Sequence, residues 1–218
     1  MNDLKVSIDH YKYKIKPTGR EIGQISNRIC KCDRVVVLKE IKDFELFANL
    51  VGEKGCTFCP ATFRNESRSQ DNFEQMQILA LDFDGGISLQ QVIERAKKYY
   101  LPIFIAYETF TSVGQNKFRI LFMNDISITD KRLAKISMNA LLTIFPEADR
   151  SCNDISKIYF GGKKLHYFDQ SLPTINTEAL LMNMTYYLKS KYGITHYKKY
   201  IEEFAKKHKI NNKKFPPY

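Results

Sequence analysis

Short apolar segments alternate with amphipathic ones between residues 76 and 168. Nearly continuous apolar runs, typical of buried strands, occupy Gln77–Phe83, Ile103–Tyr107, Phe118–Met123 and Lys157–Phe160. A segment with apolar residues at helical spacing follows the first run and is capped by Ser88; another, capped by Thr129, precedes the fourth run. The resulting order, β-α-β-β-α-β, predicts an α+β fold with a ferredoxin-like (RRM-like) core at about residues 76–168.

The flanking segments predict an N-terminal α/β extension and C-terminal helices. The extension comprises strands at Lys5–Ile8 and Val35–Leu38, a helix at Ile41–Val51, an edge strand at Thr57–Phe63 that contains Pro60, and a polar loop at Arg64–Glu74. Beyond the core, Leu165–Phe168 is expected to pair with Lys157–Phe160, and helices are expected at Thr177–Lys191 and His196–Lys207. These segments predict a domain over residues 1–175 and a helical segment over residues 176–218.

The composition is that of a globular protein, with 44% hydrophobic and 27% charged residues, which excludes a wholly disordered chain, a collagen and a simple coiled coil. The net charge of +10 indicates an anionic partner. Residues 189–218 hold nine lysines but only two glutamates. We expect this segment to bind single-stranded nucleic acid through Lys198, Lys199, Lys206 and Lys207, with Tyr197 and Tyr200 available for base stacking. The alternative is a solubilising surface.

No apolar run reaches the length of a membrane span, and the N-terminus lacks the apolar region of a signal peptide. The odd number of cysteines, five, therefore predicts reduced thiols in the cytoplasm. Cys30-x-Cys32 and Cys56-x₂-Cys59 leave a zinc site open as an alternative, although the first pair has the wrong spacing and no glycines flank it.

Two carboxylates, Asp82 and Asp84, end the first core strand and point to the same face. They repel each other unless a cation lies between them, and Mg²⁺ or Mn²⁺ suits carboxylate ligands. The alternative is a pair of solvated aspartates before the Gly85-Gly86 turn. A third ligand is expected from Asp149, with Asp154 and then Glu147 as the alternatives.

Basic and hydroxyl side chains gather in the hairpin between the second and third core strands. Lys117 and Arg119 are two residues apart on a strand, so they share a face, and Thr109, Thr111 and Ser112 precede them. Together with Lys157, these groups suit a triphosphate beside a metal ion. The alternative is a hairpin with an exposed basic face.

The runs GCTFCPATFRNE, QILALDFDGG, YETFTS, NKFRILF and EADRSCNDISKIYFGG resemble the archaeo-eukaryotic primase superfamily. The resemblance covers roughly residues 50–168 and is greatest to the primase-polymerases of plasmids, phages and other mobile elements. In that family the first motif is a strand ending in DxD or DxE, matched by Asp82 and Asp84, and the third is an acidic residue matched by Asp149. The second motif has Ser-x-His, of which this chain has Ser112 but no histidine.

The resemblance implies an RRM-like catalytic core and template-dependent joining of nucleoside triphosphates on single-stranded DNA. It further implies two divalent ions held by Asp82, Asp84 and Asp149, with residues 1–175 as the primase-polymerase domain. Many relatives carry a helicase domain, but the chain has no GxxxxGK[ST] motif. Unwinding would therefore require a separate helicase chain or a missing C-terminal part.

Two other functions compete with this interpretation. LDFDGG also resembles the nucleophile motif of haloacid-dehalogenase-type phosphatases, which expect a helical crossover after each strand. A non-catalytic RRM-like nucleic-acid-binding replication protein would instead expose aromatic residues on its sheet, and Phe83, Phe104, Phe118 and Phe122 are the candidates.

Overall fold

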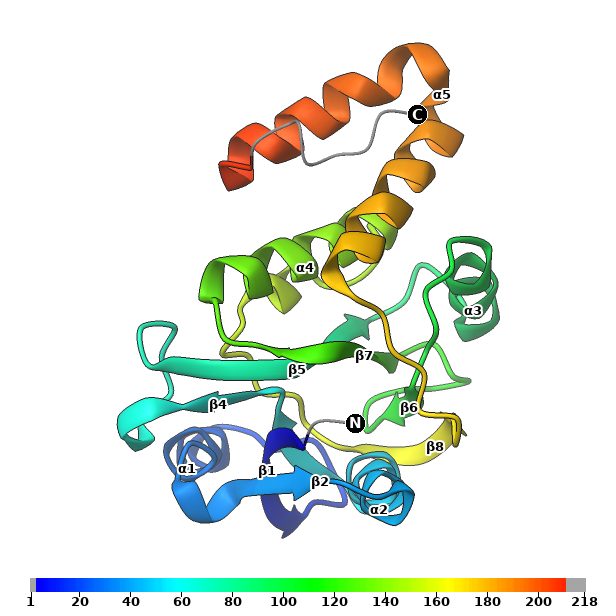
Figure 1. Cartoon of the computed structure of the whole chain (residues 1–218). Coiled ribbons are helices and arrows are strands. Elements are labelled where there is room, and N and C mark those ends of the chain that lie inside the picture. Colours follow the sequence, from blue (N-terminus) through cyan, green and yellow to red (C-terminus); the bar gives the residue numbers. More distant parts are fainter. Residues whose placement is uncertain (1–2, 211–218) are drawn as a thin grey trace.

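A five-stranded antiparallel sheet forms the middle layer of the computed structural model, which describes residues 3–210 (Figure 1). Its spatial order is β4-β5-β7-β6-β8. The strands are β4 (Ala61–Phe63), β5 (Phe73–Phe83), β6 (Ile105–Thr109), β7 (Phe118–Ile128) and β8 (Gly162–Phe168). The α+β class predicted from the sequence is confirmed.

The predicted β-α-β-β-α order is present as β5, α3 (Leu89–Lys98), β6, β7 and α4 (Lys131–Ile144). Ser88 caps α3 through a capping box, because its hydroxyl accepts from the Gln91 N–H while the Gln91 side chain accepts from the Ser88 N–H. The cap of α4 is Asp130, whose carboxylate accepts from the Arg132 N–H, and not the predicted Thr129.

The predicted strand at Lys157–Phe160 is wrong. Within this segment only Tyr159 forms a bridge, by exchanging backbone hydrogen bonds of 2.8 and 3.0 Å with Phe58 of the other sheet. The Phe58 and Tyr159 rings also stack, with centroids 5.4 Å apart. The strand that follows, β8, pairs with β6 and not with Lys157–Phe160, while β4 occupies the edge beside β5. The sheet therefore lacks the predicted fourth core strand.

A second, three-stranded sheet packs below the first and has the order β2-β1-β3 (Figure 1). It consists of β1 (Leu4–Lys12), β2 (Val35–Leu38) and β3 (Cys56–Cys59), with α1 (Arg20–Arg28) and α2 (Ile41–Gly52) beside it. The sequence analysis missed α1, a polar helix without a side-chain N-cap. Pro60 divides the predicted strand Thr57–Phe63 into β3 and β4, which belong to different sheets.

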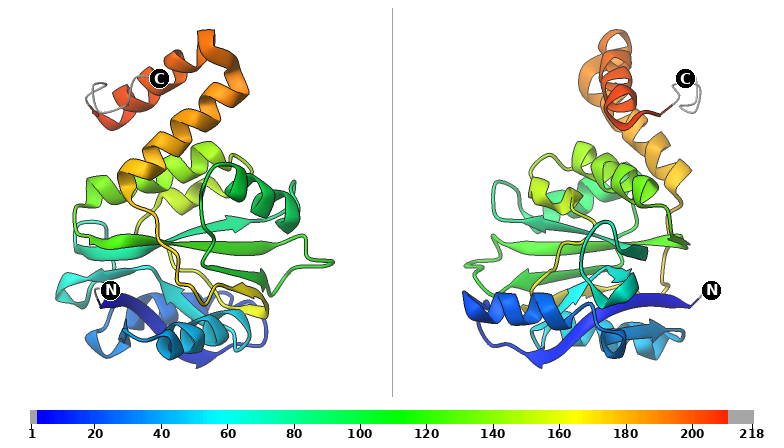
Figure 2. Two further views of the ribbon diagram at one scale, coloured as in Figure 1. Left: turned by 45° about the vertical axis from the view of Figure 1, so that its right-hand side comes forward. Right: turned by 90° about the vertical axis from the view of Figure 1, so that its left-hand side faces the viewer.

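Helices α3 and α4 cover the other face of the five-stranded sheet, and α5 (Thr177–His208) lies above α4 (Figure 2). The two predicted C-terminal helices form this one element, which bends at Gly193 and turns back. The Gly193 backbone has φ 74°, which a glycine adopts without steric cost. Whether residues 1–175 form a domain of their own stays a prediction.

None of the helices within residues 3–210 combines the length and apolar character that crossing a membrane requires.

Candidate active site

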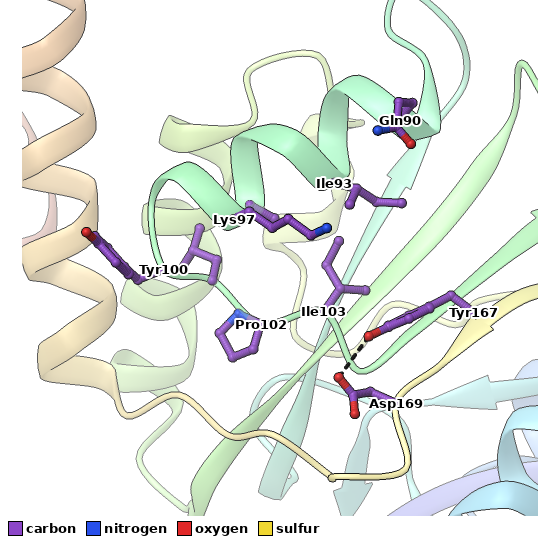
Figure 3. A pocket seen from close by; sticks show the side chains of 10 residues that line it. Gln90, Ile93, Lys97, Tyr100, Pro102, Ile103, Tyr167 and Asp169 are labelled. Atoms are coloured by element: carbon purple, nitrogen blue, oxygen red, sulfur yellow. Dashed lines mark hydrogen bonds between the residues drawn. The ribbon is translucent and has the colours of Figure 1, made fainter.

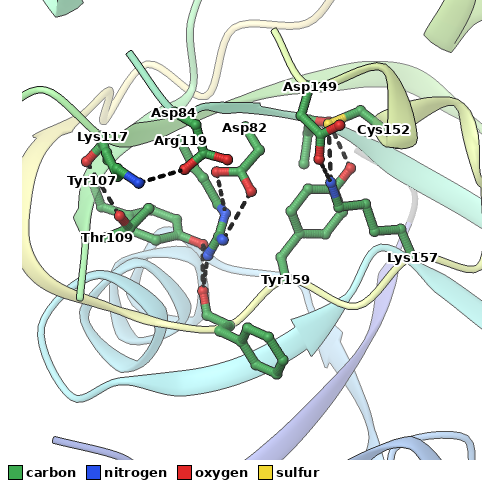
Figure 4. A network of polar contacts seen from close by, with 12 residues as sticks. Asp82, Asp84, Tyr107, Thr109, Lys117, Arg119, Asp149, Cys152, Lys157 and Tyr159 are labelled. Carbon is green, nitrogen blue, oxygen red and sulfur yellow. Dashed lines mark hydrogen bonds and ion pairs between the residues drawn. The ribbon is translucent and has the colours of Figure 1, made fainter. Parts of the chain in front are cut away.

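Asp82, the second-last residue of β5, lies directly opposite Arg119 of β7 (Figure 4). Side chains of directly paired residues share a face of the sheet, so the carboxylate and the guanidinium meet. Arg119 Nη2 donates to Asp82 Oδ2 at 3.0 Å, and Arg119 Nε lies 2.9 Å from Asp82 Oδ1. Both side chains are at least nine-tenths buried. A buried ion pair therefore ends the first core strand.

Further partners hold the Arg119 guanidinium. Nη1 donates to the Tyr107 hydroxyl at 3.4 Å and to the Phe160 carbonyl, and the Tyr159 ring centroid lies 5.7 Å from the guanidinium carbon. Burial alone would lower the pKa of Arg119, but the neighbouring Tyr107 and Asp82 outweigh it and raise the pKa. Arg119 is thus a charged partner of Asp82 and is not an exposed anion-binding group.

Asp84 forms the outer, solvent-exposed part of the site. Its carboxylate lies 3.4 Å from the Lys117 ammonium, and its side chain is 64% exposed. An exposed pair of this length contributes little to stability, so the two side chains can separate at low cost. The chain turns away at Gly85 and Gly86, where φ values of 124° and 80° favour glycine.

Asp149 reaches the end of β5 through its backbone. Its N–H donates to the Asp82 carbonyl at 2.8 Å, and its side chain accepts from the Ser151 N–H at 2.9 Å and from Lys157 Nζ at 2.8 Å. Burial alone would raise the pKa of Asp149, but the hydrogen bonds from Lys157 and Ser151 outweigh it and lower the pKa to about 2. The carboxylate is therefore ionised at neutral pH.

The two alternative third ligands have other partners. Asp154 accepts from Gln70 Nε2 at 2.9 Å and from the Ser156 hydroxyl at 2.7 Å, and Glu147 pairs with Arg95 at 2.6 Å. Neither is joined to β5 in the way that Asp149 is.

Three carboxylates thus gather at the end of β5, and each faces a basic side chain: Asp82 faces Arg119, Asp84 faces Lys117, and Asp149 faces Lys157. These bases supply part of the charge compensation that the sequence analysis expected from a metal ion.

A divalent ion fits the chemistry of this carboxylate set. Asp82 Oδ1 is buried and accepts no hydrogen bond from a described residue, although Arg119 Nε lies 2.9 Å away, so this is the oxygen that a metal ion would share with the guanidinium. However, no three Asp, Glu, His or Cys side chains within residues 3–210 are grouped as metal ligands. Metal binding by all three would therefore require the carboxylates to approach one another, and Lys117 and Lys157 to move away from Asp84 and Asp149.

The polar side chains of the hairpin between β6 and β7 differ in their exposure to solvent. Thr111 is exposed, whereas Ser112 is buried and its hydroxyl accepts from the Lys117 N–H at 3.1 Å. Thr109 is also buried and donates to the Lys117 carbonyl at 3.4 Å. The Ser112 and Thr109 hydroxyls stabilise the turn, so Thr111 and the Lys117 ammonium are the accessible groups among those predicted to bind a triphosphate.

A polar cluster that the sequence analysis missed lies around Glu108. This buried carboxylate is 3.4 Å from Lys163 Nζ and 3.5 Å from His166 Nε2. Burial would raise its pKa, but the hydrogen bond from Ser112 and the charge of Lys163 outweigh it and lower the pKa. The available signal was a glutamate within an otherwise apolar strand, which indicates a charged partner on a neighbouring strand.

The cysteines are all free thiols. Burial raises the pKa of Cys56 to about 11 and that of Cys59 to about 12, which disfavours the thiolates that zinc requires. Cys30 instead donates to the Glu66 carbonyl at 3.0 Å. The geometry favours ordinary thiols over the alternative zinc site.

The C-terminal half of α5 presents lysines to solvent and apolar residues to the protein. Its exposed bases include Lys198, Lys199, Lys206 and Lys207. Ile201, Phe204 and Ala205 are buried, as expected. Tyr197 is buried as well, so its predicted role in base stacking is wrong, and Tyr200 stacks on Tyr192 at 3.8 Å. Two other lysines of the basic segment, Lys213 and Lys214, lie outside the described residues.

No protein-family model matches this chain, and no curated protein matches its sequence. Among solved structures, the chain is similar to the AEP domain of the primase-polymerase of cyanophage S-2L. The TM-score is 0.47 and the sequence identity 10%, over 84% of this chain and 88% of that one. At this identity the similarity assigns no role to any residue.

Proposed function

We propose that the chain is a nucleotidyltransferase of the primase-polymerase type, of a plasmid or phage, which joins nucleoside triphosphates on a single-stranded DNA template. The observation that carries the proposal is the hydrogen bond from the Asp149 N–H to the Asp82 carbonyl. It supports the proposal because it joins the Asp149 backbone to the end of the strand that carries Asp82 and Asp84. Carboxylates at one strand end, each paired with a base, suit the transfer of an anionic phosphoryl group.

In this proposal Asp82, Asp84 and Asp149 hold Mg²⁺ or Mn²⁺. The ions would supply charge stabilisation for the attacking and leaving oxygens of phosphoryl transfer.

The chain's own bases have two roles in the proposal. Lys117 and Lys157 leave their carboxylates and bind the triphosphate. Thr111 and the turn organised by Ser112 are close to Lys117 and contribute on that side. Arg119 does not reach the nucleotide; it fixes the orientation of the Asp82 carboxylate through the buried ion pair. Arg119 is therefore a positioning residue rather than the nucleotide ligand suggested by sequence.

Two observations disfavour the competing functions. The strands β5, β7, β6 and β8 are antiparallel to their neighbours, whereas a haloacid-dehalogenase-type phosphatase needs a helical crossover after each strand. Phe83, Phe104, Phe118 and Phe122 are fully buried, so they do not form the exposed stacking surface of an RRM-like binder.

Asp84→Asn is the sharpest test of the proposed function, because this carboxylate is exposed and its loss should leave the fold intact. We expect the wild-type chain with Mn²⁺ to extend a primer on a single-stranded template. We expect Asp84→Asn to slow extension by at least about 100-fold, since a metal ligand contributes several kcal/mol to catalysis. Gel analysis of labelled primers measures the rate.

Asp71→Asn is the matched control, because it removes an exposed aspartate that also pairs with a lysine, Lys131, near the other end of β5. It should extend primers at the wild-type rate. Release of inorganic phosphate from phosphomonoesters without primer extension would identify a phosphatase, and template binding without either reaction would identify a binding protein. Either result contradicts the proposal.

The basic half of α5 is proposed to hold the template by counterion release. Changing Lys198, Lys199, Lys206 and Lys207 together to glutamine should flatten the slope of log K against log salt by about 3, at roughly 0.7 per phosphate contact. Fluorescence anisotropy with a labelled single strand measures it. Substitution is preferable to deletion, because the same segment buries Ile201 and Phe204.

The control for this charge change replaces four exposed lysines at the N-terminus, Lys5, Lys12, Lys14 and Lys16, with glutamine. It lowers the net charge equally but leaves α5 untouched. Equal slopes for the two variants would make the C-terminal lysines a solubilising surface.

A further inference from the structure

A cavity of about 670 Å³ lies between α3 and the adjoining ends of β6 and β8 (Figure 3). It is on the opposite face of the sheet from the carboxylates. Tyr167, which lines it, pairs directly with Ala106, and neighbouring residues of a strand point to opposite faces. Tyr107, the next residue of β6, points toward Arg119 and Asp82. The cavity is therefore separate from the candidate active site.

The lining combines an apolar floor with a few polar groups. Ile93, Pro102 and Ile103 provide aliphatic surface, and the Tyr167 ring extends along the other side (Figure 3). The Tyr167 hydroxyl donates to Asp169 Oδ2 at 2.8 Å, which fixes the direction of the ring. Flat apolar walls with a few hydrogen-bonding groups suit a planar heteroaromatic ring.

Positive charge lies beside these walls. Lys97 lines the cavity and is exposed, whereas the Lys98 ammonium lies over the Tyr99 ring, 5.4 Å from its centroid. A ring-binding surface next to an ammonium group suits a nucleobase with its phosphate. The volume is within the range of about 300–1,000 Å³ typical of ligand sites.

A second aromatic side chain, that of Tyr100, also lines the cavity. Tyr100, at the end of α3, is 74% exposed and lies toward α5 (Figure 3). Asn183 of α5 donates to the Tyr100 carbonyl at 3.3 Å and so stabilises this turn. Two exposed tyrosines along one surface exceed what a single base needs, and together with Lys97 they suit successive nucleotides of one strand.

We infer that this cavity binds an unpaired nucleotide of single-stranded nucleic acid, with the base against Tyr167 and the phosphate near Lys97. The inference builds on the proposed function, because a template-using enzyme must hold single-stranded nucleic acid. It adds a contact on the other face of the sheet from the carboxylates.

The test measures binding of a fluorescent 12-nucleotide oligothymidine to the full chain by anisotropy, in EDTA and without triphosphates. Tyr167→Ala should weaken binding by about ten-fold, since stacking one base on an aromatic ring contributes that much or more. Tyr167→Phe keeps the ring and should remain within about two-fold of wild type. Lys97→Gln should flatten the salt slope by about 0.7. The control is Tyr11→Ala, which removes a 62% exposed tyrosine from β1 and should change nothing.

Three outcomes would overturn the inference. Wild-type affinity for Tyr167→Ala would show that the cavity does not bind the strand, and an equal loss for Tyr167→Phe would show that the ring is not the contact. If Tyr167→Ala weakened the binding of thymidine monophosphate as much as the binding of the oligonucleotide, the occupant would be a free nucleotide. Circular dichroism verifies that each variant is folded.

The binding test is independent of catalysis. Asp84→Asn should bind the oligonucleotide as wild type does, because the carboxylates lie on the other face. Binding that depends on Tyr167 in a chain unable to extend primers would contradict the proposed function and support the inference. Primer extension by the wild-type chain, together with unaltered oligonucleotide binding in Tyr167→Ala, would support the proposed function and contradict the inference.

Discussion

Asp82→Asn should lower the free energy of unfolding by about 3–5 kcal/mol and abolish primer extension. The substitution leaves the Arg119 guanidinium buried without its counter-charge, and breaking a buried ion pair from one side has a cost of this size. The repulsion between Asp82 and Asp84 expected from the sequence would instead predict that Asp82→Asn raises the free energy of unfolding. The buried ion pair outweighs that repulsion, because Asp84 is exposed and has its own base.

A double-mutant cycle with Arg119→Met tests the cause of this loss. Each single substitution should lower the free energy of unfolding. The double substitution should lower it by about 2 kcal/mol less than the sum of the two single losses, because no unpaired charge remains buried. Urea denaturation of the four proteins provides the free energies. Primer extension should stay absent in the double variant, since the carboxylate is still missing. Additive free energies would show that the two side chains are not coupled.

Gly161→Ala should destabilise the protein by about 3 kcal/mol or more. A Cβ atom at Gly161 would lie 2.3 Å from the carbonyl carbon of Gly55, and backbone cannot move aside as the end of a flexible side chain can. At this point the segment between Tyr159 and β8 lies against the residues that precede β3. Thermal and urea denaturation measure the loss.

The matched control is Gly23→Ala in α1, where a Cβ atom would meet nothing within 4 Å. Alanine is favoured over glycine inside a helix by about 0.5–1 kcal/mol, so this variant should be slightly more stable than wild type. A similar small change for both variants would show that the contact between Gly161 and Gly55 is looser than described.

The ion pairs of the site were predictable in principle. The β-α-β-β order makes the first and third core strands antiparallel neighbours, and each carries its charges two residues apart: Asp82 and Asp84 on one, Lys117 and Arg119 on the other. Antiparallel pairing then sets the inner aspartate against the arginine and the outer one against the lysine. Each strand taken alone shows only two bases on one face, which favours a triphosphate; the pairing of the two strands shows their carboxylate partners.

Other features depend on contacts that no local pattern encodes. The segment Lys157–Phe160 is apolar enough for a strand, yet Tyr159 bonds to Phe58 and the sheet edge beside β5 belongs to β4. Pairing partners distant in sequence decide this, and strand propensity does not. Likewise, Gln77–Phe83 was predicted from its apolar run, but β5 begins at Phe73 because β4 pairs with its polar start.

The hydrogen bond from the Asp149 N–H to the Asp82 carbonyl joins two distant parts of the chain at a single amide. A backbone amide exchanges its proton with solvent only when its hydrogen bond opens. In a deuterium-exchange experiment, the Asp149 amide should therefore exchange only when the segment after α4 leaves the end of β5. The protection of the Asp149 amide against exchange would therefore measure the free energy that keeps the third carboxylate in place. The measurement needs no substrate.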